Sequence, residues 1–145
     1  MRKLVSGLAL WLVLAGLCFA APGGTATVSA VDARAVQLVV RAQLDAFADD
    51  DAKLAFSFAA PSIRGMFGTP ENFLEMVRSG YPVVYRPASV TFLKPTPDAN
   101  EIVQPVQMTD GQGGSWLAVY RVQRQKDKSW RITGCVLVPE RGQAT

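Results

Sequence analysis

Residues 115–139, SWLAVYRVQRQKDKSWRITGCVLVP, decide the fold because they hold two alternating runs of apolar side chains separated by a polar break. Alternation with a period of two is the pattern of a β-strand that buries one face. In the first run, the shared face consists of Trp116, Ala118, Tyr120 and Val122. The break, residues 126–129 (KDKS), predicts a tight turn, so the stretch is expected to form a β-hairpin.

The register of this hairpin follows from the need to bury both apolar sets on one face. If Lys128 takes a left-handed conformation, Val122 pairs with Ile132 and Arg124 pairs with Trp130. On this inner face we expect the second strand to present Trp130, Ile132, Gly134, Val136 and Val138. In the preceding hairpin, the register that keeps the same face of the strand inward pairs Gln104 with Tyr120 and Met108 with Trp116.

Before the hairpin, the sequence predicts three helices and two further strands. The helices are expected from the N-cap Ser29 to Phe47, over residues 52–60, and over residues 69–80. Residues 81–87 are expected to be extended, because a residue that precedes proline avoids the helical region. The strands are expected at residues 89–93 and 101–109, with a Pro-rich turn over residues 94–100; Pro105 indicates an edge or a bulge.

Three helices followed by about four antiparallel strands predict an α+β domain with the helices packed on one face of a curved sheet. This order resembles the cone-shaped nuclear transport factor 2-like fold. Residues 44–87 and 129–137 resemble a bacterial family known as domain of unknown function 4864. The most specific pieces are Met66-Phe67-Gly68, Gly80-Tyr81-Pro82, Tyr85-Arg86-Pro87 and residues 130–135. The resemblance implies a fold, and it brings no activity and no catalytic residues.

The N-terminal residues 1–20 are predicted to be a secretory signal peptide that is cleaved after Ala20. The basic start and the apolar run over residues 4–17 support this interpretation, which places the protein in the periplasm or outside the cell. A retained membrane anchor and a lipoprotein modified at Cys18 stay open as alternatives. Residues 21–29 are expected to be a disordered spacer, residues 30–140 a single domain, and residues 141–145 a tail.

Composition excludes several classes of function. Cleavage would remove Arg2 and Lys3, so that 13 basic residues face 12 acidic ones and no basic stripe remains; nucleic acid is therefore not an expected partner. The chain has no histidine, which excludes Ser-His-Asp and Cys-His nucleophiles and any imidazole metal site. The run of aspartates at residues 49–51 is interpreted as a helix cap. We expect no metal and no cofactor.

The expected inner face of the sheet carries Gln104, Trp116 and Tyr120 among aliphatic side chains. A few polar groups in an apolar concavity are typical of a small-molecule pocket, and we name these three residues and Tyr85 as candidate ligand-binding residues. The prediction is a non-catalytic domain that binds an apolar or amphipathic ligand, or a protein partner, in the cell envelope. An isomerase- or hydratase-like enzyme that uses Tyr120 with a helix carboxylate is the alternative.

The opposite face is expected to carry an apolar strip of Leu117, Val119, Cys135 and Leu137. If the helices cover the other face, this strip is exposed, and such strips mark interfaces. It predicts a homodimer about a two-fold axis, so that a structural dimerisation module is a third possible role. Cys135 would be the last cysteine left after cleavage, and its position within a strand favours a small buried apolar group.

Overall fold

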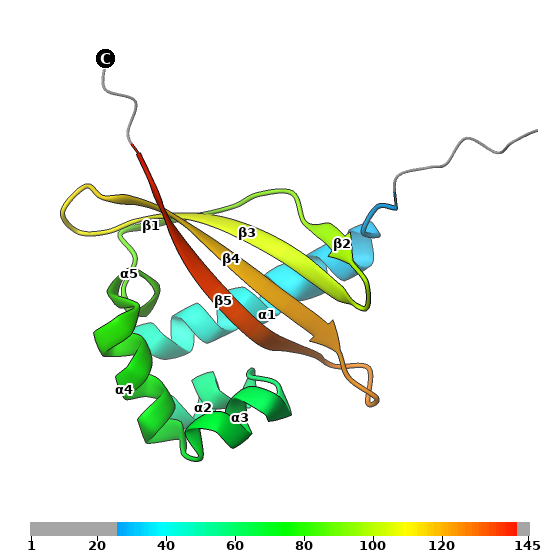
Figure 1. Cartoon of the computed structure of the whole chain (residues 1–145), viewed down its shortest axis with the longest axis horizontal. Helices are drawn as coiled ribbons and strands as arrows, with labels where there is room; N and C mark the ends of the chain where they lie inside the picture. The colour runs from blue at the N-terminus through cyan, green and yellow to red at the C-terminus, as the bar shows by residue number, and fades with distance from the viewer. Residues whose placement is uncertain (1–25, 142–145) are drawn as a thin grey trace, which may run out of the picture.

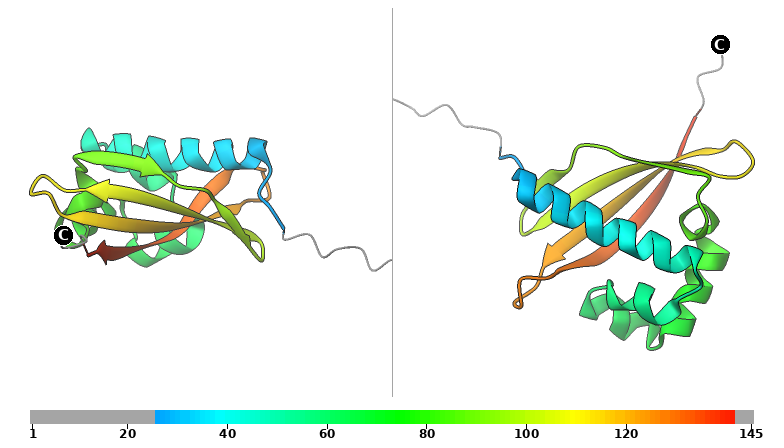
Figure 2. Two further views of the ribbon diagram at one scale, coloured as in Figure 1. Left: turned by 90° about the horizontal axis from the view of Figure 1, so that it is seen from above. Right: turned by 180° about the vertical axis from the view of Figure 1, so that it is seen from behind.

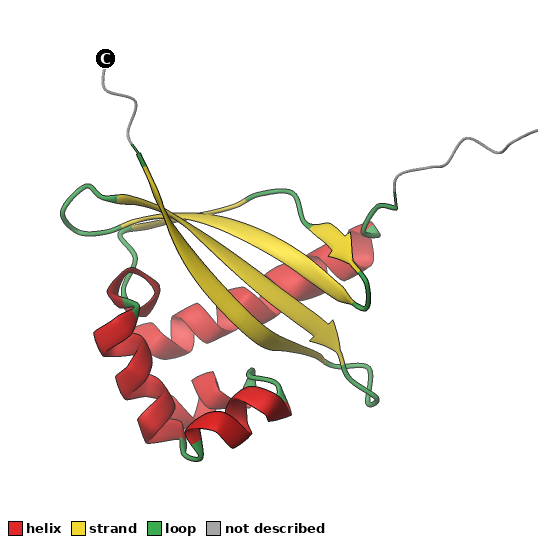
Figure 3. Ribbon diagram, viewed as in Figure 1, coloured by secondary structure: helices red, strands yellow, loops and turns green. Residues whose placement is uncertain are grey.

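The computed structural model describes residues 26–141 (Figures 1 and 3). The predicted signal peptide, residues 1–20, lies outside the described residues, and so does Cys18. Residues 21–25 of the predicted spacer and 142–145 of the predicted tail lie outside them as well. Within the described part of the chain, no helix is long and apolar enough to cross a bilayer.

Within residues 26–141 the helical part consists of five helices rather than the three that were expected. They are α1 (Ala30–Ala48), α2 (Ala52–Ser57), α3 (Pro61–Phe67), α4 (Pro70–Gly80) and α5 (Pro82–Tyr85). Both additional helices begin at a proline in the first helical position, where its missing N–H is not needed. Residues 81–87 were expected to be extended, and this is wrong for α5. The restriction applies to Tyr81, which does have φ −133°, but Pro82 itself starts a helical turn.

The first helix follows its predicted pattern. Ser29 caps α1, because its Oγ accepts a hydrogen bond of 3.1 Å from the backbone N–H of Asp32. The buried face of α1 is formed by Val36, Val40, Gln43, Leu44, Ala46 and Phe47. Figure 2 shows α1 lying across one face of the sheet, where this face meets the inner side chains of the strands.

The sheet contains five antiparallel strands: β1 (Ser89–Phe92), β2 (Thr96–Asp98), β3 (Glu101–Thr109), β4 (Ser115–Arg124) and β5 (Trp130–Glu140). β1 and β2 share one side of β3, and β4 and β5 follow on the other side. The short β2 lies in the segment that was expected to be a turn. The α+β class is confirmed, with helices first and a curved antiparallel sheet afterwards.

The predicted register is confirmed along the whole β3–β4 pair and, in the β4–β5 pair, next to the turn. Gln104 pairs with Tyr120, and Val122 pairs with Ile132. Lys128 has the expected left-handed conformation, with φ 69°. At the β4–β5 turn, the guanidinium of Arg124 lies 5.2 Å from the ring centre of its partner Trp130.

A β-bulge changes the rest of the second strand. Arg121 pairs with Gly134 while Val122 pairs with Ile132, so that Thr133 is the additional residue. One additional residue exchanges the two faces of the strand beyond it. Gly134, Val136 and Val138 were predicted on the inner face with Ile132, and this is wrong: they follow the outer-facing Arg121, Val119 and Leu117.

The predicted interface strip is therefore wrong in two of its four members. Cys135 pairs with Tyr120 and Leu137 pairs with Ala118, so both lie on the inner face under the helices. The outer strip consists instead of Leu117, Val119, Val136 and Val138. Its two β5 members are the most exposed, at 61% for Val136 and 45% for Val138.

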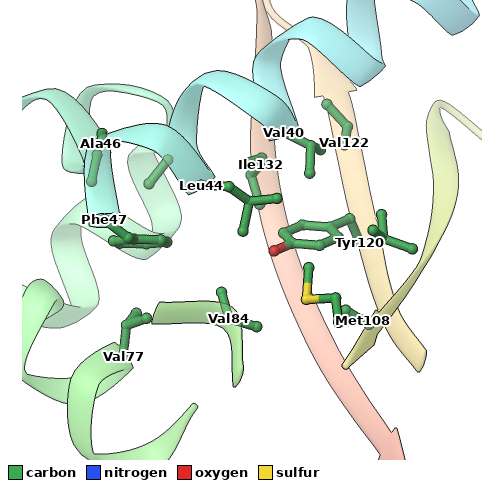
Figure 4. Close-up of a cluster of buried hydrophobic side chains, with 14 of the residues drawn as sticks. Val40, Leu44, Ala46, Phe47, Val77, Val84, Met108, Tyr120, Val122 and Ile132 are labelled. Carbon is green, nitrogen blue, oxygen red and sulfur yellow. The ribbon is translucent and has the colours of Figure 1, made fainter. Parts of the chain in front are cut away.

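The core lies between the inner face of the sheet and the helical layer. Figure 4 shows Val40, Leu44 and Phe47 of α1 facing Tyr120, Val122 and Ile132 of the sheet, with Val77 and Val84 on the far side. Tyr120 is the largest of the fully buried side chains. These contacts come from every part of the described chain, so the helices and the sheet share one core.

Pro105 lies in a strand that has neighbours on both sides, and it is tolerated because the ladder is interrupted beside it. Its carbonyl accepts a 3.0 Å hydrogen bond from the N–H of Leu93, between β1 and β2. In a regular pair, residue 105 would return a hydrogen bond to the carbonyl of Leu93, but proline has no N–H. The side-chain Nε2 of Gln104 donates to that carbonyl instead, at 2.8 Å. β3 is therefore not an edge strand as the proline suggested. The ladder lacks one backbone hydrogen bond beside Pro105, and the side chain of the buried Gln104 replaces it.

We expect Gln104→Leu to lower the free energy of unfolding by about 1–3 kcal/mol, because the Leu93 carbonyl then loses its donor. In a Pro105→Ala background, the restored N–H of residue 105 can donate to that carbonyl. The same glutamine substitution should therefore be less destabilising there. Urea unfolding of the wild type, both single variants and the double variant measures the coupling. Equal losses in both backgrounds would contradict the substitution of one donor for the other.

Candidate functional site

An apolar cavity of about 240 Å³ lies between the helical layer and the last two strands. Its walls come from α1 (Gln43, Phe47), the segment through α3 (Ala59, Ile63, Met66, Phe67), α4 (Phe73, Met76, Val77), the α5 region (Tyr81, Val84) and the sheet (Tyr120, Ile132, Gly134, Cys135). Met66 at the margin is 72% exposed, which is unusual for a methionine and marks the side that faces solvent. We call this cavity the apolar pocket.

The connection between α3 and α4 holds one wall of the apolar pocket in place. Gly68 ends α3 with φ 77°, a conformation that favours glycine. Thr69 then caps α4 by accepting a 3.2 Å hydrogen bond from the N–H of Asn72, whose own side chain donates to the carbonyl of Phe67. Phe73 follows directly. Its ring centroid lies 5.6–5.7 Å from the ring centroids of Phe47, Phe56 and Phe67.

The bulge at Thr133 forms the opposite wall. Without the additional residue, Cys135 would face outward and Gly134 would stand under the helices. With it, the Cys135 thiol joins Tyr120 at the pocket. A glycine inside a strand pattern indicates a bulge, so Gly134 is a signal in the sequence that could have revealed the exchange of faces.

Tyr120 lines the apolar pocket from β4, and its hydroxyl is buried. The residue is 1% exposed, and among the described residues the hydroxyl has no hydrogen-bond partner. Figure 4 shows the ring reaching from β4 toward the helical layer. Burial is the main cause that raises the pKa of Tyr120 well above its usual value, and the nearby thiol of Cys135 raises it further, so the group stays protonated and can donate one hydrogen bond.

Gln43 adds an amide to the same wall. It is 3% exposed, and its Nε2 donates a 3.1 Å hydrogen bond to the carbonyl of Ala55, which ties α1 to α2. Its side-chain oxygen remains available as an acceptor, because no described residue donates to it. Sequence reasoning missed Gln43, since its position on the apolar face of α1 can be recognised only from the burial of that face.

The structure brings only one of the four predicted ligand-binding residues into the apolar pocket, namely Tyr120. Gln104 is fully buried beside Tyr120 in the sheet, but its amide nitrogen donates to the carbonyls of Leu93 and Pro105, and the residue does not line the apolar pocket. Tyr85 lies elsewhere, in a cluster that joins the α1–α2 turn to α4 and α5. Its hydroxyl donates to Asp50, and this hydrogen bond is the main cause that lowers the pKa of that carboxyl.

Trp116 lines a second hollow, a broad cleft of about 850 Å³ between α4, α5, the β3–β4 turn and the end of β5. Its indole N–H donates to the carboxylate of Asp110 at 3.1 Å. That carboxylate also accepts the backbone N–H groups of Gln112 and Gly114, and these contacts lower its pKa. Tyr81 and residues of β5 separate the cleft from the apolar pocket, and Tyr81 lines both.

Among the described residues that line the apolar pocket, none is acidic. The alternative enzyme needs a helix carboxylate, but Glu75 of α4 lies outside this lining and forms an exposed ion pair of 3.1 Å with Arg78. No group of three or more potential metal ligands occurs within residues 26–141. The lining therefore carries two tyrosines, one glutamine and one cysteine among apolar side chains.

A family model described as Domain of unknown function (DUF4864) matches residues 29–145. No curated protein matches the chain in sequence. A solved structure described as an NTF-2 like protein of unknown function from Burkholderia xenovorans LB400 is 12% identical, over 77% of this chain and 88% of that chain, with a TM-score of 0.47. Similarity at this level transfers neither a site nor a function.

We expect the thiol of Cys135 to react slowly with a maleimide at neutral pH while the protein is folded. Burial raises its pKa from 9.0 to about 12, which lowers the thiolate fraction on the order of a thousandfold. Peptide mapping by mass spectrometry, in buffer and in urea, separates this thiol from Cys18. Labelling that is as fast in buffer as in urea would show that the thiol is not held inside the pocket.

Proposed function

The chain belongs to the family described as Domain of unknown function (DUF4864), and we propose that it is a non-catalytic binding domain. Its apolar pocket takes up an apolar or amphipathic group, which belongs to a small ligand or to a partner protein. The observation that carries this proposal is a cavity without charged residues in its lining, to which Tyr120 contributes a buried hydroxyl that has no hydrogen-bond partner among the described residues.

The polar inventory of the pocket supports binding. A buried hydroxyl without a partner is unfavourable by about 1–3 kcal/mol, and most buried polar groups in native proteins are paired. A ligand that accepts a hydrogen bond from Tyr120 would remove that penalty. Three of the four sequence pieces that carry the family resemblance contribute to the pocket wall, through Met66, Phe67, Tyr81 and Cys135 among others.

The volume of the pocket limits the size of the group that enters it. A dry cavity of about 150 Å³ lined by aliphatic side chains accepts benzene. The apolar pocket, at about 240 Å³, has room for a substituted six-membered ring or a branched aliphatic side chain. Because its lining carries no charge, a charged group would be poorly solvated there.

Catalysis is a weaker candidate. A tyrosine hydroxyl can stabilise an enolate, but the isomerisation that was considered also needs a base within hydrogen-bond reach of the substrate. No lining residue supplies a carboxylate, and the pKa of about 12 keeps the Cys135 thiol protonated. The arrangement supports recognition better than proton transfer.

We expect Tyr120→Phe to leave the folded structure intact and to be neutral or slightly stabilising, because it removes an unpaired hydroxyl. The same change should weaken binding of p-cresol about fivefold, the effect of one hydrogen bond of about 1 kcal/mol. Toluene, which has the same ring without a hydroxyl, is the matched control and should bind both forms equally. Isothermal titration measures all four affinities.

Failure of both probes to bind the wild type would contradict the proposed function. Equal loss of p-cresol and toluene binding in the variant would show instead that Tyr120 shapes the pocket without donating to the ligand. Native mass spectrometry of the purified protein provides an independent check, since a co-purified ligand would shift the mass of the wild type.

The place of action is proposed to be the cell envelope or the medium, on the basis of the basic start and the apolar run over residues 4–17. The exported protein is then expected to begin at Ala21. Intact-mass analysis of the exported protein decides this. A mass that retains residues 1–20 would support an anchor, and a lipid adduct on Cys18 would support a lipoprotein; either outcome contradicts cleavage after Ala20.

A homodimer remains a second candidate role, and one observation favours it. The outer strip, as corrected, keeps Leu117 and Val119 next to the exposed Val136 and Val138, and no described helix covers this face (Figure 2). The two most exposed members lie on β5, at the margin of the sheet. The outer face is thus most apolar near its free edge.

A further inference from the structure

The last strand has one side without a strand partner. β5 pairs with β4 and ends the sheet. At its start this free side is closed, because Ile132 accepts from the N–H of Ala60 and donates to the carbonyl of Phe58, both at 2.8 Å. Beyond the bulge, residues 134–140 have no strand beside them among the described residues. Figure 1 shows this part of β5 running along the rim of the sheet.

The direction of the backbone groups on this edge follows from the alternation of an antiparallel ladder. The β3–β4 turn is closed by a 2.9 Å hydrogen bond from the N–H of Asp110 to the carbonyl of Gly114. The next residue, Ser115, therefore turns its backbone groups away from β3, toward its partner Glu140 on β5. By the same alternation, the backbone N–H and C=O groups of Val138 and Val136 bond to β4. The backbone N–H and C=O groups of Leu137 and Cys135 point to the free edge.

Two hollows open beside these two residues. Cys135 lines the apolar pocket, and Leu137 lines the broad cleft. The two positions are two residues apart, which is the repeat of side chains on one face of a strand. A strand laid along this edge would thus present successive inner side chains to the two hollows, on either side of Tyr81. Its side chain in between would face outward beside Val136, which is 61% exposed.

We propose that the free edge of β5 binds an extended segment of another polypeptide as an additional antiparallel strand. Backbone hydrogen bonds to Cys135 and Leu137 hold the segment, one apolar side chain enters the apolar pocket, and the next inner side chain enters the cleft. This recognition mode combines main-chain hydrogen bonds for affinity with side-chain pockets for specificity. It rests on the proposed function, because it uses the same apolar pocket and names the class of ligand.

A partner segment fits this edge better than a second copy of the chain. Helices α4 and α5 flank the edge on its inner side, where they form walls of both hollows. A two-fold β5–β5 pair would bring a second set of these helices into the same space above the seam. An isolated extended segment carries no such helices. Residues 134–140 contain no lysine to oppose pairing, and Pro139 and the bulge at Thr133 limit the open edge to the residues between them.

The experiment uses a synthetic peptide, acetyl-Lys-Thr-Leu-Val-Leu-Thr-Lys-amide, whose two leucines can occupy the two hollows. Hydrogen exchange of the isotope-labelled protein is followed by NMR with and without peptide. In the free protein, the amides of Cys135 and Leu137 should exchange fast, whereas those of Val136 and Val138 are protected by β4. Saturating peptide should slow exchange at Cys135 and Leu137 at least tenfold and leave Val136 and Val138 unchanged.

A matched pair of control peptides tests the hydrogen bonds. N-methylation of both leucines removes the donors that face β5 and should lower the affinity about tenfold or more. N-methylation of the central valine, whose N–H faces solvent in the antiparallel arrangement, should change it little. Peptide binding without protection of Cys135 and Leu137, or equal effects of the two methylations, would overturn the proposal.

Three further outcomes are decisive. Protection of Cys135 and Leu137 without peptide, increasing with protein concentration, would show that a second copy occupies the edge and would overturn the proposal. No peptide binding by a protein that binds p-cresol and toluene would also overturn it, but the pocket and the proposed function would stand. No binding of any of the three probes would remove both.

Discussion

The pairing of β4 with β5 is the constraint on which the rest of the structure depends. At one end it aligns Val122 with Ile132 and closes the hairpin through a left-handed Lys128. At the bulge it admits Thr133 as an additional residue and exchanges the two faces of β5. This additional residue places the side chain of Cys135 on the inner face with Tyr120, and Gly134 beside it also lines the apolar pocket. The apolar pocket and the free edge both follow from it.

Buried polar groups in this protein serve two different purposes. The amide of Gln104 replaces the hydrogen bond that Pro105 cannot donate, and that of Gln43 ties α1 to α2. Both are therefore needed by the fold. The hydroxyl of Tyr120 has no such partner, although it is as deeply buried as Gln104. The side-chain oxygen of Gln104 is unpaired as well, so what distinguishes the two residues is that the amide nitrogen of Gln104 has a structural hydrogen bond and the Tyr120 hydroxyl has none.

The pocket and the edge lie side by side because the helices do not extend over the whole inner face of the sheet. α1 covers the centre, while the segment from α3 to α5 stands beside β5 and encloses the two hollows (Figures 1 and 2). An apolar pocket next to unpaired backbone groups can bind the side chains and the main chain of an extended segment at the same time.

The sequence by itself determined the α+β class, the family, the caps of α1 and α4, and the pairing of Gln104 with Tyr120, because periodicity and capping act over a few residues. The tertiary structure decided the bulge, the two proline-started helices and the set of residues around the pocket. Hydrophobic burial fixes the register of a strand only where apolar and polar residues alternate. Beyond Gly134 both faces of β5 are apolar, so either face could have been the inner one. The pocket joins residues from α1 to β5 that share no local signal. Only the packing of the helices against the strands shows that Tyr120 reaches it and that Gln104, Trp116 and Tyr85 do not.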